Sequence, residues 1–262
     1  MNYKKIIFEK DGKIAIVTLN NPKSYNSYDP ILAEELYKVF KEIRWNSDIR
    51  VVILKAEGKA FSAGGDIKSF KEAIDKNNFP QMVEDLTLTL NGTVLLMKEM
   101  DKIIISYIDG IVAGVGLSFA LNTDISIATE DSVFIGGYNA LATTPDGGAS
   151  YPFVKFAGIS KAMYFFLSND KFSARQLEDW GLISKVIKKD EGFEFVINFA
   201  KKIAEGPFEA TIKTKKLFYK GINLSFEEYI ELEREGIISS SQTKDMEEAV
   251  NSFIEKRKPK FQ

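Results

Sequence analysis

Short apolar runs bounded by turn residues recur along the first half of the chain. They are rich in β-branched residues and predict buried strands at Lys13–Asn20, Val51–Lys55, Ile103–Ile108 and Asp124–Ala128. Amphipathic stretches separate these runs, and strands that alternate with helices predict an α/β fold.

The first amphipathic stretch carries a helix start signal. Asp29 is a good N-cap, and Pro30 follows at the first helical position. The apolar positions that share one face of this predicted helix are Leu32, Leu36, Phe40 and Ile43.

The last third of the chain is almost wholly helical. Ser173 with Gln176 and Ser225 with Glu228 have capping-box spacing. A final helix is predicted from about Thr243, with acidic residues early and the basic residues Lys256, Arg257 and Lys258 in its last turn. We expect an α/β core over residues 1–200 and a helical region over residues 201–262, packed on the core or on a neighbouring subunit.

Composition removes several classes of enzyme. The 262 residues include no histidine and no cysteine, which excludes Ser-His-Asp triads, thiol nucleophiles, Cys/His zinc sites, haem and iron–sulfur clusters. The 35 basic and 37 acidic residues give a net charge of −2, which argues against nucleic acid as the main partner. Catalysis must therefore depend on carboxylates, hydroxyls, amines or backbone amides.

Neither a leader nor a membrane span is predicted from the sequence. The segment Met1–Lys10 lacks the apolar stretch of a signal peptide, and no apolar run reaches the roughly 18 residues of a membrane span. We expect a cytoplasmic protein with no membrane partner.

Two glycine-containing segments follow predicted strands, FSAGGDI at Phe61–Ile67 and DGIVAGVG at Asp109–Gly116. Small residues let a ligand approach the main chain, and two convergent N–H groups would form an oxyanion hole. The alternative is that both are tight turns where helix and sheet pack closely. A dinucleotide fingerprint is excluded, because Phe119 stands where its third glycine belongs.

These segments, together with Asn21-Pro22-Lys23 before them and TPDGGAS at Thr144–Ser150 after them, resemble the crotonase superfamily of enoyl-CoA hydratases and isomerases. The resemblance covers nearly the whole chain. It implies a spiral of ββα units with a helical C-terminal trimerisation region, an acyl-CoA substrate, and a homotrimer or dimer of trimers. It also implies no cofactor besides the coenzyme A of the substrate.

The resemblance also implies an oxyanion hole and a departure from hydratase chemistry. The two donors fall on the amides of Gly65 and Val115, the second of which is usually glycine in the family. The two glutamates of family hydratases are replaced by Ser118 and Tyr138. Water addition needs an acid and a base, and neither residue readily acts as a carboxylate base near pH 7.

One carboxylate, Asp146, remains in the expected region. The phenylacetate-pathway 1,2-epoxyphenylacetyl-CoA isomerases, which this chain resembles in VAGVG and PDGG, have an aspartate at the matching position. One base that moves a proton next to a carbonyl suffices for isomerisation. The alternative is a turn-forming aspartate, since proline precedes it and two glycines follow.

Further residues are implied to meet the substrate. Lys23 is a candidate phosphate contact, and Tyr138 would line the pocket or donate a hydrogen bond. Asp66 is alternatively a helix N-cap. The full set of expected substrate-binding residues is Lys23, Ala63, Gly64, Asp66, Gly114 and Tyr138.

An acyl-CoA isomerase with Asp146 as base is the leading interpretation. A hydratase would need a second carboxylate, for which Glu72, Glu84 and Asp85 are candidates without a means to choose. A dehalogenase-like enzyme is disfavoured because that branch uses a histidine. A non-catalytic acyl-CoA-binding protein stays open.

Overall fold

Two β-sheets form the centre of the protein. The computed structural model describes residues 3–262. The six-stranded sheet has the order β1-β2-β3-β5-β7-β10, and the four-stranded sheet has the order β4-β6-β8-β9. The strands are β1 (Ile6–Asp11), β2 (Ile14–Leu19), β3 (Val51–Ala56), β4 (Ala60–Ser62), β5 (Ile103–Ile108), β6 (Ile111–Ala113), β7 (Ile125–Thr129), β8 (Val133–Ile135), β9 (Phe172–Ser173) and β10 (Lys185–Ile187).

A ββα unit repeats through these sheets. The first strand of each pair β3/β4, β5/β6 and β7/β8 lies in the larger sheet, and the second lies in the smaller one. Equivalent strands of successive units pair in parallel within each sheet. The predicted α/β class and the spiral of ββα units are confirmed.

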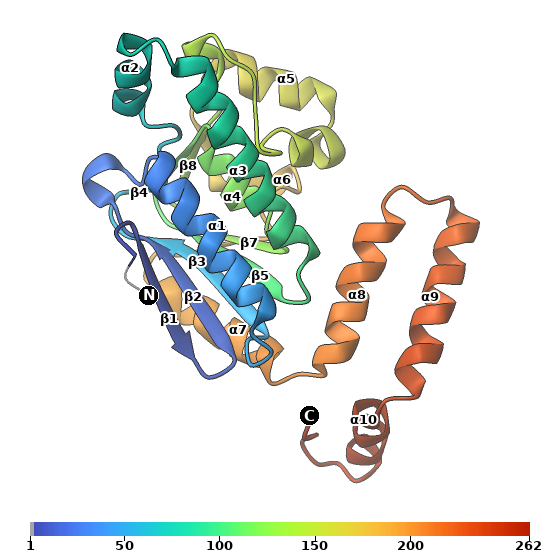
Figure 1. Ribbon diagram of the computed structural model, residues 1–262. Coiled ribbons are helices and arrows are strands. Elements are labelled where there is room, and N and C mark those ends of the chain that lie inside the picture. Colours follow the sequence, from blue (N-terminus) through green and yellow to red (C-terminus); the bar gives the residue numbers. More distant parts are fainter. Residues whose placement is uncertain (1–2) are drawn as a thin grey trace.

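Helices cover both faces of the larger sheet (Figure 1). On β3, Val52 and Leu54 belong to the core that includes α1 and α3, whereas Val51 and Ile53 belong to the core that includes α7. This alternation follows from the two-residue period of a strand. The helices are α1 (Pro30–Trp45), α2 (Ile67–Asp75), α3 (Phe79–Glu99), α4 (Gly116–Leu121), α5 (Ile159–Ser168), α6 (Ala174–Asp179), α7 (Gly192–Ala204), α8 (Phe208–Gly221), α9 (Phe226–Ser241) and α10 (Lys244–Ile254).

The predicted helix starts are confirmed, and one predicted helix end is wrong. Asp29 caps α1 by accepting the Leu32 amide at 2.9 Å, and both capping boxes form. Helix α10 follows its Thr243 cap as expected but ends at Ile254, before the basic residues. The chain turns at Lys256, whose φ is +55°, and Arg257 pairs with Glu248 instead of extending the helix.

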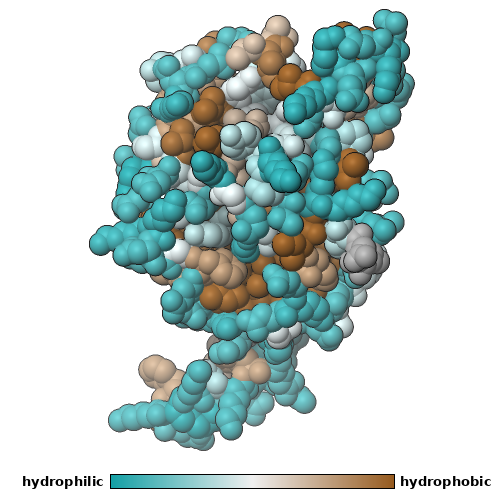
Figure 2. All heavy atoms as spheres, turned by 90° about the vertical axis from the view of Figure 1, so that its left-hand side faces the viewer, coloured by the Kyte–Doolittle hydropathy of each residue, from teal (hydrophilic) through white to brown (hydrophobic). Residues whose placement is uncertain are grey.

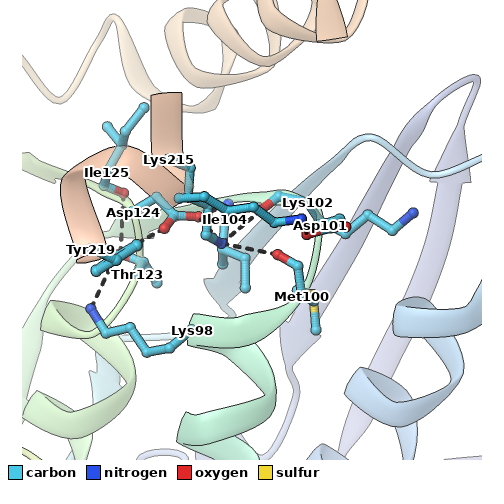
Figure 3. Close-up of polar contacts among 11 residues, drawn as sticks. Lys98, Met100, Asp101, Lys102, Ile104, Thr123, Asp124, Ile125, Lys215 and Tyr219 are labelled. Atoms are coloured by element: carbon cyan, nitrogen blue, oxygen red, sulfur yellow. Dashed lines mark hydrogen bonds and ion pairs between the residues drawn. The ribbon is translucent and has the colours of Figure 1, made fainter. Parts of the chain in front are cut away.

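Helices α8 and α9 project away from the sheets (Figure 1). Lys215 of α8 ties this region to the core, because its buried ammonium donates to the carbonyls of Met100 and Lys102 and to Asp124 Oδ2, the last at 2.9 Å (Figure 3). Asp124 Oδ1 also accepts the Tyr219 hydroxyl at 2.9 Å. The expected division at residue 200 falls inside α7 and stays a prediction.

Replacing Tyr219 with phenylalanine is expected to lower the free energy of unfolding by about 1–2 kcal/mol, because a hydrogen bond to the Asp124 charge is lost. Denaturant titration at pH 7 measures the change. Tyr37→Phe is the control: Tyr37 is 37% exposed against 40% for Tyr219, and within residues 3–262 its hydroxyl makes no hydrogen bond. Equal losses in both variants would contradict an anchoring role for Tyr219.

The surface seen from the side away from α8 and α9 is mostly hydrophilic, with separate apolar patches (Figure 2). Within residues 3–262, no helix combines the length and apolar character needed to cross a membrane. The cytoplasmic location stays a prediction.

Candidate active site

The two glycine-containing segments meet beside the smaller sheet. The glycines Gly64, Gly65 and Gly114 follow the neighbouring strands β4 and β6, which pair in parallel. A Cβ atom at Gly64 would lie 3.2 Å from the Ala113 carbonyl oxygen and 3.5 Å from Gly114 Cα. Gly64 also has φ +98°, a backbone conformation that suits glycine. The sequence therefore brings the main chains of these segments into direct contact.

Two backbone amides at this contact have no internal acceptor. The Tyr28 amide donates to Gly64 O at 2.8 Å and the Asp66 amide donates to Tyr28 O at 3.0 Å, which leaves the Gly65 N–H between them unused. Val115 directly precedes α4, where the first N–H groups of a helix lack partners. Neither the Gly65 nor the Val115 amide donates a hydrogen bond within the part of the chain that the structure describes.

The segment that follows β8 also lies against this contact. A Cβ atom at Gly137 would lie 3.5 Å from the Gly114 amide nitrogen. The adjacent Tyr138 is buried, and its hydroxyl donates to Asp146 Oδ1 at 2.8 Å. Ser118 of α4 donates to the Asp146 carbonyl at 3.1 Å. Asp146 is thus connected both to the β8 segment and to the helix that begins after Val115.

The carboxyl group of Asp146 has the electrostatic character of a candidate base. Burial raises its pKa above the ordinary aspartate range, and the hydrogen bond from Tyr138 opposes that shift. The pKa of Tyr138 is raised by burial and then by the Asp146 charge. The pKa of Tyr28 is raised by the same two causes. The Tyr138 hydroxyl therefore stays protonated and bonded to this carboxylate at neutral pH, whereas the Tyr28 hydroxyl donates to the Leu86 carbonyl at 3.4 Å.

The turn around Asp146 does not depend on its side chain. The Ala149 amide closes the turn by donating to the Asp146 backbone carbonyl at 2.9 Å. The carboxylate accepts the Tyr138 hydroxyl through Oδ1, and the amide of Asp146 itself also stabilises its charge. No other residue among residues 3–262 donates to Oδ2. Oδ2 is therefore the oxygen of Asp146 that could take up a proton.

Asp66 has a different position from Asp146, as the cap of α2. Its Oδ1 accepts the Ser69 amide at 2.8 Å, and its Oδ2 accepts the Ser27 hydroxyl at 2.9 Å. Although burial acts in the opposite direction, these hydrogen bonds hold the pKa of Asp66 below its ordinary value. Both oxygens are occupied, so a substrate-binding role for Asp66 stays a prediction.

Two residues that we expect to contact coenzyme A, Lys23 and Ala63, lie close to the first glycine-containing segment. The Ala63 amide donates to Tyr25 O at 3.0 Å. This bond holds the chain near Lys23 against the glycine-containing segment Phe61–Ile67. Ala63 and Lys23 are both exposed. The Lys23 ammonium forms no ion pair within the described residues. Their role in substrate binding stays a prediction.

Three residues at the site were missed from the sequence. Tyr28 lies beside Gly65 through its backbone pairing, and the Phe70 ring lies against Gly65, where an added Cβ would be 2.6 Å from Phe70 Cζ. Asn122 is buried and donates to Gly148 O at 3.1 Å. A usable signal existed only for Asn122, as a polar residue four positions after Ser118 on an otherwise apolar helix.

A separate cavity of about 530 Å³ lies between α1, α2 and α3. Glu72 and Asp85 line it, but none of the expected catalytic or substrate-binding residues does. Glu72, Glu84 and Asp85 are all exposed. We therefore locate the candidate site at the convergence of the glycine-containing segments, where free amides and a carboxylate with a raised pKa occur together.

Known proteins resemble this chain over its whole length. The model of the family described as enoyl-CoA hydratase/isomerase matches residues 9–262. Trans-2-decenoyl-[acyl-carrier-protein] isomerase of Streptococcus mutans is 26% identical, covering 100% of this chain and 99% of that protein. The 1,2-epoxyphenylacetyl-CoA isomerase of Escherichia coli is 25% identical, covering 98% and 97%. The crystal structure of enoyl-CoA hydratase from Bacillus anthracis superposes with a TM-score of 0.90 at 25% identity, covering 98% and 99%.

Proposed function

Because this chain belongs to the enoyl-CoA hydratase/isomerase family, we propose that it is an isomerase that shifts a double bond in an enoyl thioester. The observation that carries this proposal is the state of Asp146. It is a carboxylate with a raised pKa whose Oδ2 accepts no hydrogen bond from another described residue, and its turn is bonded to α4, at whose start the Val115 amide has no acceptor. One base and an oxyanion hole are what proton transfer next to a thioester carbonyl requires.

In the proposed reaction, the amides of Gly65 and Val115 donate to the thioester carbonyl oxygen. Asp146 Oδ2 removes a proton from the acyl chain, and the electrons of the C–H bond pass into a dienolate whose negative oxygen the two amides stabilise. The protonated Asp146 then returns the proton to another carbon of the dienolate. No atom is gained or lost, and the double bond has moved.

A hydratase is the second candidate from the sequence, and the structure favours it less. Ser118 and Tyr138 stand where family hydratases have glutamates, and their hydroxyls are both engaged in hydrogen bonds. Asp66 has both carboxylate oxygens engaged as a cap and in a side-chain bond. A second free carboxylate to assist water addition is therefore missing from these positions.

Isotope exchange tests the proposed isomerase. Enoyl thioesters of several chain lengths, carried on coenzyme A or on acyl carrier protein, are incubated with the enzyme in deuterated water. An isomerase incorporates deuterium and moves the double bond, whereas a hydratase product gains the mass of water. Tight thioester binding without either change would identify a non-catalytic binding protein and reject the proposal.

Replacing Tyr138 with phenylalanine is expected to move the acidic limb of the pH–kcat profile to higher pH. The Tyr138 hydrogen bond lowers the pKa of Asp146, so its loss lets burial raise that pKa further. A base is active only when deprotonated, so activity is then lost at a higher pH as the solution is acidified.

A matched variant controls for the loss of a tyrosine hydroxyl. The Tyr164 hydroxyl donates to Asp170 Oδ2 at 3.1 Å on the surface, so Tyr164→Phe breaks the same kind of bond away from the site. The pH–kcat profile of Tyr164→Phe should coincide with that of the unaltered enzyme. An unmoved acidic limb in Tyr138→Phe would show that this hydroxyl does not tune the base.

We also propose that the C-terminal helices make subunit contacts in a homotrimer or dimer of trimers. Helix α9 has no buried residue within the single chain, and Phe253 of α10 is 86% exposed. Apolar surface of this kind on a folded chain is usually covered by a partner. A monomer by light scattering at micromolar concentration would reject this assembly.

A further inference from the structure

Helix α4 is fully buried, yet it presents two polar side chains in the same direction. Ser118 is 0% exposed and Asn122, which caps the C-terminus of α4, is 3% exposed. Residues four positions apart lie on one face of a helix. Buried polar side chains of this kind are retained where they find hydrogen-bond partners, because an unpaired one is costly.

Both side chains bond to the segment that carries Asp146. The Ser118 hydroxyl donates to the Asp146 carbonyl at 3.1 Å, and Asn122 Nδ2 donates to the Gly148 carbonyl at 3.1 Å. Asn122 Nδ2 also donates to Ser118 O at 3.0 Å, within the helix. Two carbonyls of the Asp146 turn are therefore attached to one rigid element.

The same helix determines the position of the Val115 amide. Helix α4 begins at Gly116, and the Ser118 amide donates to the Val115 carbonyl at 3.0 Å. The Asp146 turn is also packed tightly against its surroundings, since a Cβ at Gly147 would lie 2.4 Å from Leu90 Cδ2 and 3.0 Å from Ser118 Oγ. One short helix thus connects the candidate oxyanion donor, the Val115 amide, to the candidate base, Asp146.

We propose that Ser118 and Asn122 are positioning residues that hold the Asp146 carboxylate at a fixed place relative to the Val115 amide. This inference rests on the proposed function, in which these two groups act on the same thioester. The position that family hydratases use for a catalytic glutamate serves here to hold the base. A displacement of about 1 Å in a reacting group can cost roughly 10²-fold in rate.

The experiment compares Ser118→Ala and Asn122→Leu with the unaltered full-length enzyme. Each variant removes one side-chain hydrogen-bond donor and puts an apolar side chain in its place. On the order of a tenfold decrease in kcat is expected for each, with KM essentially unchanged, because the base is displaced and the acyl-CoA contacts are retained. Should Asn122→Leu fail to fold, Ser118→Ala, which removes a single oxygen atom, carries the test.

Ser106→Ala is the matched control. Ser106 is a fully buried serine of β5 whose hydroxyl donates to the Ala120 carbonyl of α4 at 2.8 Å. This variant removes a buried hydrogen bond to the same helix without touching the Asp146 turn. Its kcat is expected to equal that of the unaltered enzyme. A decrease equal to that of Ser118→Ala would attribute the effect to general loosening of α4 and overturn the proposal.

A double variant separates this inference from the proposed function. In an Asp146→Asn background, Ser118→Ala is expected to have no further effect on the residual rate, because there is no base to position. An undiminished tenfold effect in that background would overturn the positioning role. Full activity of Asp146→Asn alone would instead overturn the proposed base, and kcat of Ser118→Ala and Asn122→Leu within twofold of the unaltered enzyme would overturn only their positioning role.

Discussion

Replacing Asp146 with asparagine is expected to reduce kcat by about 10²–10⁴-fold, the range that a positioned general base contributes. Asparagine has nearly the same shape, and its side-chain oxygen still accepts the Tyr138 hydroxyl that Asp146 Oδ1 accepts at 2.8 Å. The turn is retained too, because it is closed by the backbone of Ala149. The substitution removes the negative charge and with it the ability to take a proton.

Binding and catalysis must be measured separately for this variant. Calorimetric titration with a saturated acyl-CoA should give an affinity close to that of the unaltered enzyme, because the proposed carbonyl donors are main-chain amides. Asp170→Asn is the control, since Asp170 also accepts a tyrosine hydroxyl but lies on the surface. Retention of full turnover by Asp146→Asn would remove Asp146 from the mechanism and favour its interpretation as a turn residue.

The larger sheet could be predicted from the sequence because its central strands are buried on both faces. Val51–Ala56 and Ile103–Ile108 are nearly continuous apolar runs, the pattern expected for parallel strands covered by helices. The smaller sheet could not be predicted. Strands such as Ile111–Ala113 are only three residues long, too short to show a period, and they form because a neighbouring unit supplies the partner strand.

The candidate residues Gly65, Val115 and Asp146 were named by resemblance, whereas the contacts they make could not be predicted. No spacing rule predicts that the Tyr138 hydroxyl bonds Asp146, because that contact depends on how the segment after β8 folds back over α4. Asn122 was missed for the same reason, since its partner Gly148 is 26 residues away. Capping, by contrast, is local, and the caps at Asp29 and Ser173 were predicted correctly.

Replacing Val115 with proline is expected to reduce kcat by about 10²–10³-fold, the effect of deleting one oxyanion donor. Proline removes the N–H and the valine side chain but keeps a backbone conformation that the position already has. Val115 has φ −59°, within the range that proline adopts, and it directly precedes the helix, where its N–H has no helical partner. The residue before it is Gly114, whose lack of a Cβ removes one of the two clashes that a following proline causes.

The matched control is Val115→Ala, which shortens the side chain but keeps the amide. Val115 is only 5% exposed, so alanine loses packing at the start of α4 and controls for that loss. Both variants should bind acyl-CoA, and circular dichroism should show the same helical content for both. If the amide of Val115 stabilises the enolate, deuterium exchange slows by this factor only in the proline variant. Equal exchange rates in the two variants would show that the donor lies elsewhere.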